Sequence, residues 1–207
     1  MIIYVAILIA YLACSIPMGL VLTRIFLKQD VRKVGSGNIG ATNVLRTGSK
    51  ALAAATLVLD ALKPWMAYYI IRIILFYYDL QGLVNIGPGN IKILAVVVAM
   101  IGHTFPIYLK FKGGKGVATA LGAMFLFSPV WALASFSVWL FIAFAFKKSS
   151  LAALVAAICV PVLGWVFGVG NDVIALFVAL VIFVIARHTG NILRLVKGEE
   201  SNIKLGK

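Results

Sequence analysis

The chain has 207 residues, of which 63% are hydrophobic, and its 19 lysines and arginines outnumber six acidic residues, giving a formal net charge of +13. Soluble domains contain roughly 45–50% apolar residues, so this composition excludes an ordinary soluble protein and indicates an integral membrane protein. The length allows about six or seven spans of about 20 residues and no separate soluble domain, so we expect one domain over residues 1–207. The positive charge favours anionic lipid headgroups or a phosphorylated substrate, and charge alone does not choose between them.

Candidate membrane spans follow one another along the whole chain. The segment 51–78 is too long for one simple span and contains Asp60, Lys63 and Pro64, so we expect it to be tilted, kinked or split. The segment 116–127 is short for a full crossing. We predict an all-α membrane protein with about seven transmembrane helices, at residues 2–23, 51–78, 91–110, 116–127, 129–146, 150–169 and 171–187.

The distribution of basic residues predicts an orientation. If the N-terminus lies outside the cell, sixteen of the nineteen lysines and arginines fall in inner loops or in the C-terminal tail, which includes Lys204 and Lys207. The outer loops then carry Asp79, Asp172 and little else. Because cytoplasmic loops carry an excess of lysine and arginine, we predict an outer N-terminus and a cytoplasmic C-terminus.

Three glycine-rich, basic segments interrupt the apolar chain: Gly35 to Gly48, His103 to Gly116, and Arg187 to Glu200. We call them the first, second and third polar islands. Lipid does not tolerate such backbone, so each island must lie in water or line a cavity within protein. The predicted orientation puts all three on the cytoplasmic face, where their amides and basic side chains suit an anion, above all phosphate.

The first island contains GSGNIG, which matches the GxGxxG pattern of dinucleotide-binding loops. That pattern requires a preceding strand and a soluble βαβ unit, so we reject a dinucleotide site. Ser36 and Arg46 instead fit a compact loop that approaches an anion, and Arg46 can hold phosphate through two parallel hydrogen bonds. The alternative is a tight surface turn with a positive-inside arginine.

The second island centres on KGGKG, which lacks the first glycine and the final Ser or Thr of a nucleotide P-loop. Backbone amides of Gly113, Gly114 and Gly116 can still turn onto phosphate while Lys115 supplies charge. A helix that begins at Val117 would add its N-terminal dipole. The alternative is a flexible hinge between spans. His103, by contrast, has no charged partner at helical spacing, and a structural role is the simpler interpretation.

The third island begins where the last span leaves the membrane. His188 and Asn191 are three residues apart, so they share a face if the helix continues, and they could hold a substrate hydroxyl and a carbonyl. Alternatively, both cap the helix end, and Arg187 is an interfacial anchor. Ser150, after the Lys147–Lys148 break, could donate a hydrogen bond in the site or serve only as a helix N-cap.

Several familiar chemistries lack their residues here. Neither His103 nor His188 is followed four residues later by Asp, and the sequence contains no GxSxG elbow and no cluster of metal ligands. The only carboxylates in the islands are Glu199 and Glu200, in the tail, and the two cysteines are isolated. Hydrolase, metalloenzyme and His–Asp mechanisms are therefore disfavoured, and we expect no metal and no cofactor.

Taken together, SGNIGATNVLR, GHTFPIYLKFKGGKGVATALG and RHTGNILRL with KGEE closely resemble the bacterial acyl-phosphate:glycerol-3-phosphate acyltransferase family (PlsY), and the similarity covers essentially the whole chain. The resemblance implies a seven-span enzyme of the bacterial inner membrane that moves a fatty acyl group from acyl phosphate to the sn-1 hydroxyl of glycerol 3-phosphate. The products would be lysophosphatidic acid and inorganic phosphate. Its expected partners are these substrates and membrane lipid, without nucleic acid, and we expect a monomer.

The resemblance also implies site residues. The GGKG segment matches the family's phosphate-binding loop. Residues that match the family's polar site are Ser36, Arg46, Lys115, Ser150, His188 and Asn191.

The missing carboxylate base suggests a hypothesis for the mechanism. An acyl phosphate is already activated, and its own phosphate oxygen can take the hydroxyl proton as phosphate leaves. His188 and Asn191 would position groups, and Lys115 or Arg46 would offset the developing charge. The alternatives are an organic-anion or phosphate-ester transporter, which needs polar groups near mid-membrane, and a scaffold that binds anionic lipid. The enzyme hypothesis requires the islands to converge on one pocket at the inner leaflet.

Overall fold

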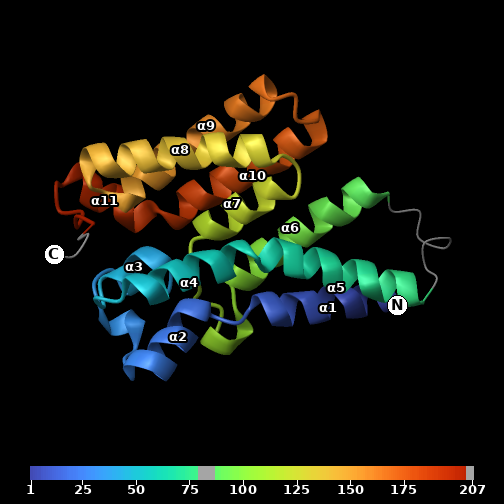
Figure 1. Cartoon of the computed structure of the whole chain (residues 1–207), viewed down its shortest axis with the longest axis horizontal. Helices are drawn as coiled ribbons and strands as arrows, with labels where there is room; N and C mark the ends of the chain where they lie inside the picture. Colours follow the sequence, from blue (N-terminus) through green and yellow to red (C-terminus); the bar gives the residue numbers. More distant parts are fainter. Residues whose placement is uncertain (79–86, 204–207) are drawn as a thin grey trace. The chain divides into compact units, whose positions relative to one another are not determined.

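The computed structural model describes residues 1–78 and 87–203, and within these ranges every regular element is a helix (Figure 1). Asp79, Lys204 and Lys207 lie outside the described residues. The chain forms two compact units, Met1–Leu126 and Phe127–Lys207, each described by itself below. The prediction of one domain stays a prediction.

The first unit contains seven α-helices and two short 3-10 helices within its described residues. The α-helices are α1 (Ile2–Cys14), α2 (Met18–Leu27), α3 (Ala41–Leu45), α4 (Lys50–Ala61), α5 (Lys63–Tyr77), α6 (Pro88–Thr104) and α7 (Val117–Phe125). The 3-10 helices are η1 (Val31–Lys33) and η2 (Ile107–Leu109). The second unit contains α8 (Pro129–Phe146), α9 (Ser149–Val166), α10 (Asn171–Arg187) and α11 (Thr189–Val196).

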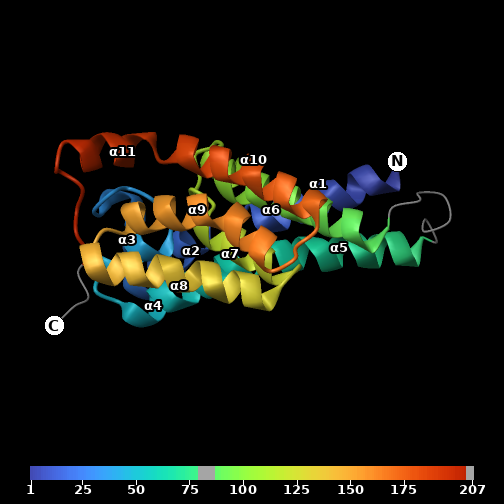
Figure 2. The same ribbon diagram turned by 90° about the horizontal axis from the view of Figure 1, so that it is seen from above.

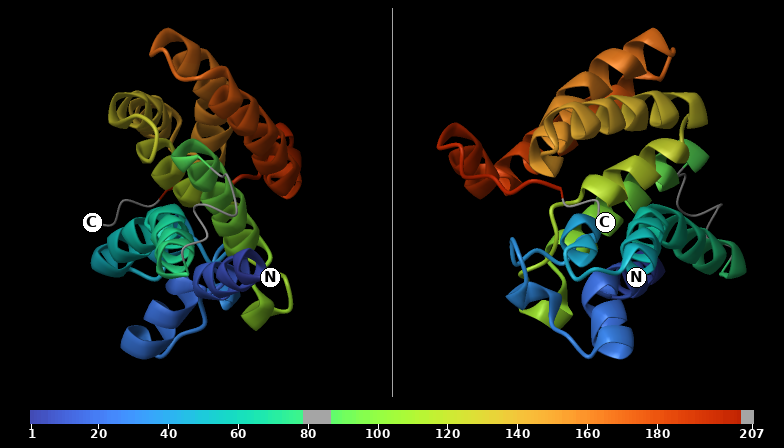
Figure 3. Two further views of the ribbon diagram at one scale, coloured as in Figure 1. Left: turned by 90° about the vertical axis from the view of Figure 1, so that its right-hand side faces the viewer. Right: turned by 60° about the vertical axis from the view of Figure 1, so that its left-hand side comes forward.

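The predicted span at residues 2–23 is broken into two helices. α1 and α2 meet at an angle of 41°, which can be followed in Figure 3, and Pro17 lies at the junction. Proline lacks an N–H and disfavours helical geometry in the preceding residue, which accounts for the break. α1 packs against α5 and α6 through its buried residues Ala6, Ala10 and Cys14, whose spacing of four residues places small side chains on one face.

The overlong segment 51–78 is split, as the sequence analysis expects. α4 ends at Ala61 and α5 begins at Lys63, with Pro64 in the first turn, where its missing N–H costs nothing. α7 packs against this break so closely that a Cβ at Gly122 would overlap the carbonyl of Ala61. The break therefore docks another helix and does not simply bend a span.

The second unit is built around α9, which packs against both α8 and α10 (Figures 1 and 2). Trp131 of α8 is fully buried, and its indole N–H donates to the carbonyl of Val160 at 2.9 Å. The ring also lies edge-on to Phe177 of α10 at 4.6 Å between centroids. This one side chain therefore joins all three long helices of the unit.

Fewer helices than expected can each cross a membrane alone. Among the described residues, three helical segments are long and apolar enough: Pro88–Leu109, Pro129–Phe146 and Ser149–Val166. The number rises to five if each of the bent pairs α1–α2 and α10–α11 forms one span. α7 has nine residues, so it is about 14 Å long against a hydrocarbon core of about 30 Å. A full crossing at 116–127 is therefore excluded for α7 alone.

Candidate active site

The first polar island is organised by Asn43, a residue of α3 that is 2% exposed. Its amide nitrogen shares two hydrogens among the carbonyls of Val31, Val34 and Asn38, at 2.7–2.9 Å. Because all three carbonyls belong to the irregular chain before α3, this amide supplies the backbone partners that no helix or sheet provides there. We call these interactions, with those of the Asn43 oxygen, the Asn43 cluster.

The oxygen of Asn43 orients the two predicted site residues of the first island. Its Oδ1 accepts from the backbone N–H and hydroxyl of Ser36, at 3.1 and 3.3 Å, and from Nη1 of Arg46 at 3.2 Å. Arg46 also lies over Gly35, where an added Cβ would come within 2.6 Å of both Arg46 Cδ and Asn43 Oδ1. The structure thus brings Ser36 and Arg46 together, and a simple surface turn does not describe this island.

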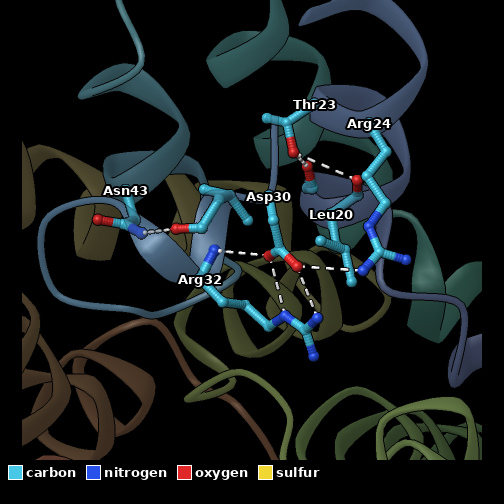
Figure 4. Close-up of polar contacts among 8 residues, drawn as sticks. Leu20, Thr23, Arg24, Asp30, Arg32 and Asn43 are labelled. Carbon is cyan, nitrogen blue, oxygen red and sulfur yellow. Dashed lines mark hydrogen bonds and ion pairs between the residues drawn. The ribbon is translucent and has the colours of Figure 1, made fainter. Parts of the chain in front are cut away.

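A charged group precedes the first island (Figure 4). Asp30 binds Arg32 through two side-chain hydrogen bonds, at 2.9 and 2.6 Å, and also accepts from Arg24 at 3.0 Å. The hydrogen bond from Arg32 is the main reason that the pKa of Asp30 lies well below its ordinary value. The carboxylate also caps η1 by accepting from the Arg32 backbone N–H, which fixes the chain just before the Asn43 cluster.

An apolar cluster joins the first and second islands within the first unit. Val31, Ile39 and Val44 are buried together, and Leu109 of the second island packs against them. Burial of such side chains stabilises each by about 1.5–3 kcal/mol, enough to hold two irregular segments in register. The convergence predicted for these two islands is thus supported at the level of their hydrophobic contacts.

The backbone N–H groups of Gly113 and Gly114, in the second island, already have carbonyl partners. The N–H groups of Gly113 and Gly114 donate to the carbonyls of Thr104 and His103, both at 3.1 Å. These are final carbonyls of α6, which have no partner within their own helix. The expectation that these two amides turn onto phosphate is therefore wrong in this structure, because they cap α6.

The remaining part of the loop retains the anion-binding features. α7 begins at Val117, directly after Gly116, whose φ of +84° is a backbone conformation that favours glycine. The first-turn N–H groups of a helix have no carbonyl partner within the helix, and the helix dipole favours an anion there. Lys115 is half-buried beside this turn. Of the loop residues predicted to bind phosphate, Lys115 and Gly116 therefore remain as candidates, together with the first turn of α7.

The third island is organised by Glu200, which the sequence analysis leaves in the tail. This carboxylate is 7% exposed and accepts from the Ser150 hydroxyl and from Asn191 Nδ2, both at 2.6 Å, and from Arg194 Nε at 2.8 Å. We call these four residues the Glu200 cluster. Burial by itself raises the pKa of Glu200, but the three hydrogen bonds outweigh it and leave the pKa below its ordinary value.

The Glu200 cluster decides two alternatives left open by the sequence. Ser150 is not the N-cap of α9, since that position is Lys148 and the Ser150 hydroxyl donates to a residue 50 positions away. Asn191 does more than cap a helix end, because its amide binds the same carboxylate oxygen as Ser150. Both residues are therefore held by one acceptor in the second unit.

His188 lies at the bend of 60° between α10 and α11 (Figure 2). The helix does not continue through it as one straight rod, so the premise that His188 and Asn191 share a helix face is wrong. Its Nδ1 lies 2.7 Å from the carbonyl of Val184, and because a carbonyl only accepts, Nδ1 carries a hydrogen. In the neutral ring, Nε2 is then the acceptor, which suits a group that receives or orients a hydroxyl proton.

The organising roles of Asn43 and Glu200 were not predicted, and only Glu200 had a sequence signal for its role. Asn43 lies in the same string of small residues as Ser36 and Arg46, but nothing in that string singles out its amide as the group that holds them. Glu200 follows Gly198, whose φ of +73° turns the chain back so that the N–H groups of Glu199 and Glu200 bind the carbonyl of Arg194. A glycine at the end of a helix is a known turning signal.

Among the described residues no cluster of metal ligands accompanies the islands, and a cavity in the first unit is apolar. In the described part of the chain, no three His, Cys, Asp or Glu side chains gather where they could hold a metal ion. An apolar cavity of about 420 Å³ lies in the first unit. It offers no charged group to a phosphate, being lined by Met18, Leu59, Leu62, Trp65, Met66 and Tyr69.

Comparison with known proteins extends across nearly the whole chain. Residues 4–198 match the family model described as glycerol-3-phosphate acyltransferase. A protein of that name from Bradyrhizobium sp. strain BTAi1 is 48% identical over 200 residues, covering 96% of this chain and 94% of the relative. One from Rhodopseudomonas palustris strain BisB5 is 47% identical over 203 residues, covering 97% and 96%.

Solved structures show the same fold. A crystal structure of PlsY, described as an integral membrane glycerol 3-phosphate acyltransferase in its glycerol 3-phosphate form, superposes with a TM-score of 0.82 at 34% identity. That match covers 98% of this chain and 96% of the other. The lysophosphatidic acid form of PlsY gives a TM-score of 0.79, also at 34% identity, and covers 97% and 94%.

Proposed function

Because the chain belongs to the glycerol-3-phosphate acyltransferase family, we propose that it transfers a fatty acyl group from an acyl phosphate to the sn-1 hydroxyl of glycerol 3-phosphate. The chain is a membrane-bound glycerol-3-phosphate acyltransferase, and the observation that carries this conclusion is the match over residues 4–198, which includes all but the last two residues of the three islands. The products are lysophosphatidic acid and inorganic phosphate. The two PlsY structures are described as the glycerol 3-phosphate form and the lysophosphatidic acid form, which is consistent with the first compound as substrate and the second as product.

In the first unit, the proposal assigns the recognition of phosphate groups to two cations. Arg46 is oriented by Asn43, and an arginine fork matches phosphate oxygens in a bidentate manner. Lys115 adds a point charge next to the N-terminal end of α7. The Ser36 hydroxyl donates to the same Asn43 oxygen as Arg46, and it supplies a further hydrogen bond when its hydrogen turns from Asn43 to the phosphate.

In the second unit, the proposal assigns positioning of the reacting groups to His188, Asn191 and Ser150. Glu200 restrains Asn191 and Ser150, so their rotamers are set before substrate binds. Preorganised polar groups are worth more than mobile ones, because the free energy of ordering them has been met during folding. Glu200 itself is a poor general base, since both its oxygens accept hydrogen bonds and its pKa is lowered.

The chemistry then proceeds without a carboxylate base. The sn-1 hydroxyl oxygen attacks the acyl carbonyl carbon, and a new ester C–O bond forms as the C–O bond to phosphate breaks. The departing phosphate oxygen takes the hydroxyl proton, so the products balance as an ester and inorganic phosphate. Arg46 and Lys115 offset negative charge on phosphate, while His188 and Asn191 position the reacting groups.

We further propose seven spans, with an outer N-terminus, a cytoplasmic C-terminus and an active site on the cytoplasmic face of the bacterial inner membrane. The concentration of sixteen basic residues in inner loops and tail supports this orientation. In this arrangement the split helices α4 and α5 together span the membrane, as do the bent pairs α1–α2 and α10–α11, while α6, α8 and α9 each cross alone. The seventh crossing is made by the short helix α7 together with the chain on either side of it.

The test is release of inorganic phosphate by purified protein given palmitoyl phosphate, with and without glycerol 3-phosphate. Release that requires both substrates, with lysophosphatidic acid formed in equal amount, is the expected result. Uptake of glycerol 3-phosphate into sealed vesicles without product would instead favour a transporter. His188→Ala should lower turnover by about 100-fold, in the range typical of losing a group that positions the reacting atoms. Near-normal turnover in this variant would remove His188 from the mechanism.

A further inference from the structure

Three ionisable side chains are buried together at the break between α4 and α5. Asp60, Lys63 and His103 are 2%, 1% and 4% exposed. Lys63 Nζ lies 2.8 Å from Asp60 Oδ1 and 3.2 Å from His103 Nδ1, and His103 Nδ1 lies 3.4 Å from Asp60 Oδ1. The three residues come from the end of α4, the start of α5 and the end of α6, so the group joins three helices.

Such a group is expensive to bury and calls for a reason. A charged pair in a protein interior loses hydration worth several kcal/mol per ion, and apolar side chains of the same size are often as stable. Buried ionisable residues in membrane proteins therefore indicate a functional role. The mechanism proposed above uses none of these three side chains.

The lysine determines how the histidine ring presents itself. An ammonium group only donates, so Lys63 requires Nδ1 of His103 to accept, and the ring hydrogen of the neutral histidine then resides on Nε2. The ring is thereby held at one edge by Lys63, whose ammonium group also binds Asp60 Oδ1. Its opposite edge faces the glycine loop of the second island.

The contact between ring and loop is close and specific. A Cβ added at Gly114 would overlap Nε2 of His103, and the next nearest atoms, at 2.7 and 2.9 Å, also belong to that ring. At Gly113 the obstruction is different, because a Cβ there would overlap the backbone carbonyl of His103 and the ring of Pro106. The His103 side chain therefore sets the position of Gly114, immediately before Lys115.

The other end of the loop is held at the same break. Thr119, in the first turn of α7, donates its hydroxyl to the backbone carbonyl of Asp60 at 3.2 Å. The indole of Trp65 donates to the carbonyl of Gly122 at 3.1 Å. Residues at the α4–α5 break thus fix α7, while the His103 side chain fixes the loop that precedes α7.

We propose that Asp60, Lys63 and His103 are positioning residues that hold Gly114 and Lys115 in the conformation that binds phosphate. The inference rests on the proposed phosphate-binding role of Lys115. It explains why a buried ionic group is kept where apolar packing would suffice for stability: hydrogen bonds and charge fix the angle of the His103 ring, which apolar contacts would leave free to rotate.

The main experiment is a double-mutant cycle between His103 and Gly114. Gly114→Ala should raise the KM for glycerol 3-phosphate and the Ki of inorganic phosphate by about ten-fold, because the new methyl group displaces the loop from the ring. His103→Asn retains an acceptor for Lys63 but shortens the side chain, so His103→Asn/Gly114→Ala should recover most of that loss. Gly113→Ala is the matched control, since its methyl group meets backbone and His103→Asn should not rescue it.

A second pair of variants tests the charged partners. Lys63→Met leaves Asp60 buried without a cation, and Asp60→Asn/Lys63→Met removes both charges to protect folding. The double variant should melt close to the wild type yet show KM and Ki raised by about ten-fold, because the His103 ring loses its anchor. A purely structural role would lower the amount of active enzyme and leave KM and Ki unchanged.

The outcomes separate this inference from the function on which it rests. If Lys115→Met leaves the KM for glycerol 3-phosphate and the Ki of phosphate unchanged, the phosphate role of the loop is wrong. If Lys115→Met raises both, but the His103–Gly114 cycle is additive and Asp60→Asn/Lys63→Met has wild-type constants, the loop role stands and the positioning role is overturned.

Discussion

The Asn43 cluster and the Glu200 cluster both fix predicted site residues in place, but they do so with different chemical groups. Each places one buried acceptor between side chains predicted to act in the site, Ser36 and Arg46 in the first case, Ser150 and Asn191 in the second. Asn43 is neutral and reaches no more than 12 residues along the chain, whereas Glu200 is ionisable and reaches Ser150 across 50 residues.

This difference has consequences for folding and for pH. A cluster of near neighbours can form as soon as its loop closes, because the entropy of closing a short loop is small. A cluster that links α9 to the tail requires the second unit to be assembled first. A neutral amide is also indifferent to pH, while protonation of a carboxylate turns one of its two acceptor oxygens into a donor.

The largest effect is expected for Asn43→Ala, which leaves three backbone carbonyls without their donor and releases both Ser36 and Arg46. Each unsatisfied buried group costs about 1–3 kcal/mol, so the free energy of unfolding should fall by about 3 kcal/mol or more, and turnover by about 100-fold. Thermal melting in detergent measures the loss of stability, and phosphate release measures the loss of turnover. Thr47→Val, which removes only a local bond to the Val44 carbonyl, is the control. Turnover within three-fold of wild type in Asn43→Ala would contradict the role of Asn43 in orienting Ser36 and Arg46.

Glu200→Gln should lower turnover by about ten-fold, less than the loss in Asn43→Ala. The glutamine oxygen can still accept from both Ser150 and Asn191, which share one carboxylate oxygen, but its new NH₂ group then meets the donor of Arg194, which previously faced the other oxygen. Phosphate release per folded molecule is the measurement. The neighbouring Glu199 is exposed, so Glu199→Gln is a control of equal charge and should behave as wild type. Equal activities in the two variants would show that the carboxylate at position 200 is dispensable.

Acid should weaken the Glu200 cluster and leave the Asn43 cluster unaffected. The pKa of Glu200 is lowered in the folded protein, so its stabilisation is complete above the ordinary value near 4.5 and is lost as the pH falls through the folded value. The difference in melting temperature between wild type and Glu200→Gln should therefore shrink as the pH falls from 7 to 3. The difference between wild type and Asn43→Ala should stay constant over the same range, and a parallel decline in both would refute the contrast.

The smallest effect is expected for Asp30→Asn, outside both clusters. Its ion pairs with Arg24 and Arg32 are largely exposed on the arginine side, where such pairs contribute about 0–1 kcal/mol and are screened by salt. Asparagine can still cap η1 by accepting from the Arg32 N–H. A melting temperature within about two degrees of wild type, with the difference vanishing at 1 M salt, is the expected result. A larger loss would mean that the Asp30 carboxylate supports the Asn43 cluster beyond capping.

Helix positions were predicted best where hydropathy and proline agree. The segments 129–146 and 171–187 coincide with α8 and α10, and the split of 51–78 follows from the charges and proline it contains. The break at Pro17 was missed because the apolar run continues through it. Hydropathy indicates whether a segment lies in apolar surroundings, and it carries no information on where a helix axis bends.

Site residues could be predicted individually but their partners could not. His103 was interpreted as lacking a charged neighbour because only positions along its own helix were considered, whereas its partners Lys63 and Asp60 lie 40 or more residues away. The amides of Gly113 and Gly114 were assigned to phosphate, although the end of α6 uses them. Spacing along a sequence predicts neighbours within a helix and carries no information on which helices meet.

By itself, the sequence determined that this is an integral membrane protein, where its polar islands lie and which acyltransferase family it resembles, because composition, charge and motifs are properties of the chain in order. Only the tertiary structure decided that Asn43 organises the first island, that Glu200 organises the third, and that a buried Asp60–Lys63–His103 group contacts the second. Whether the islands meet in one pocket stays a prediction. The physical reason is that a hydrogen bond between distant residues depends on how helices pack, and packing follows from the whole set of contacts, which no single motif specifies.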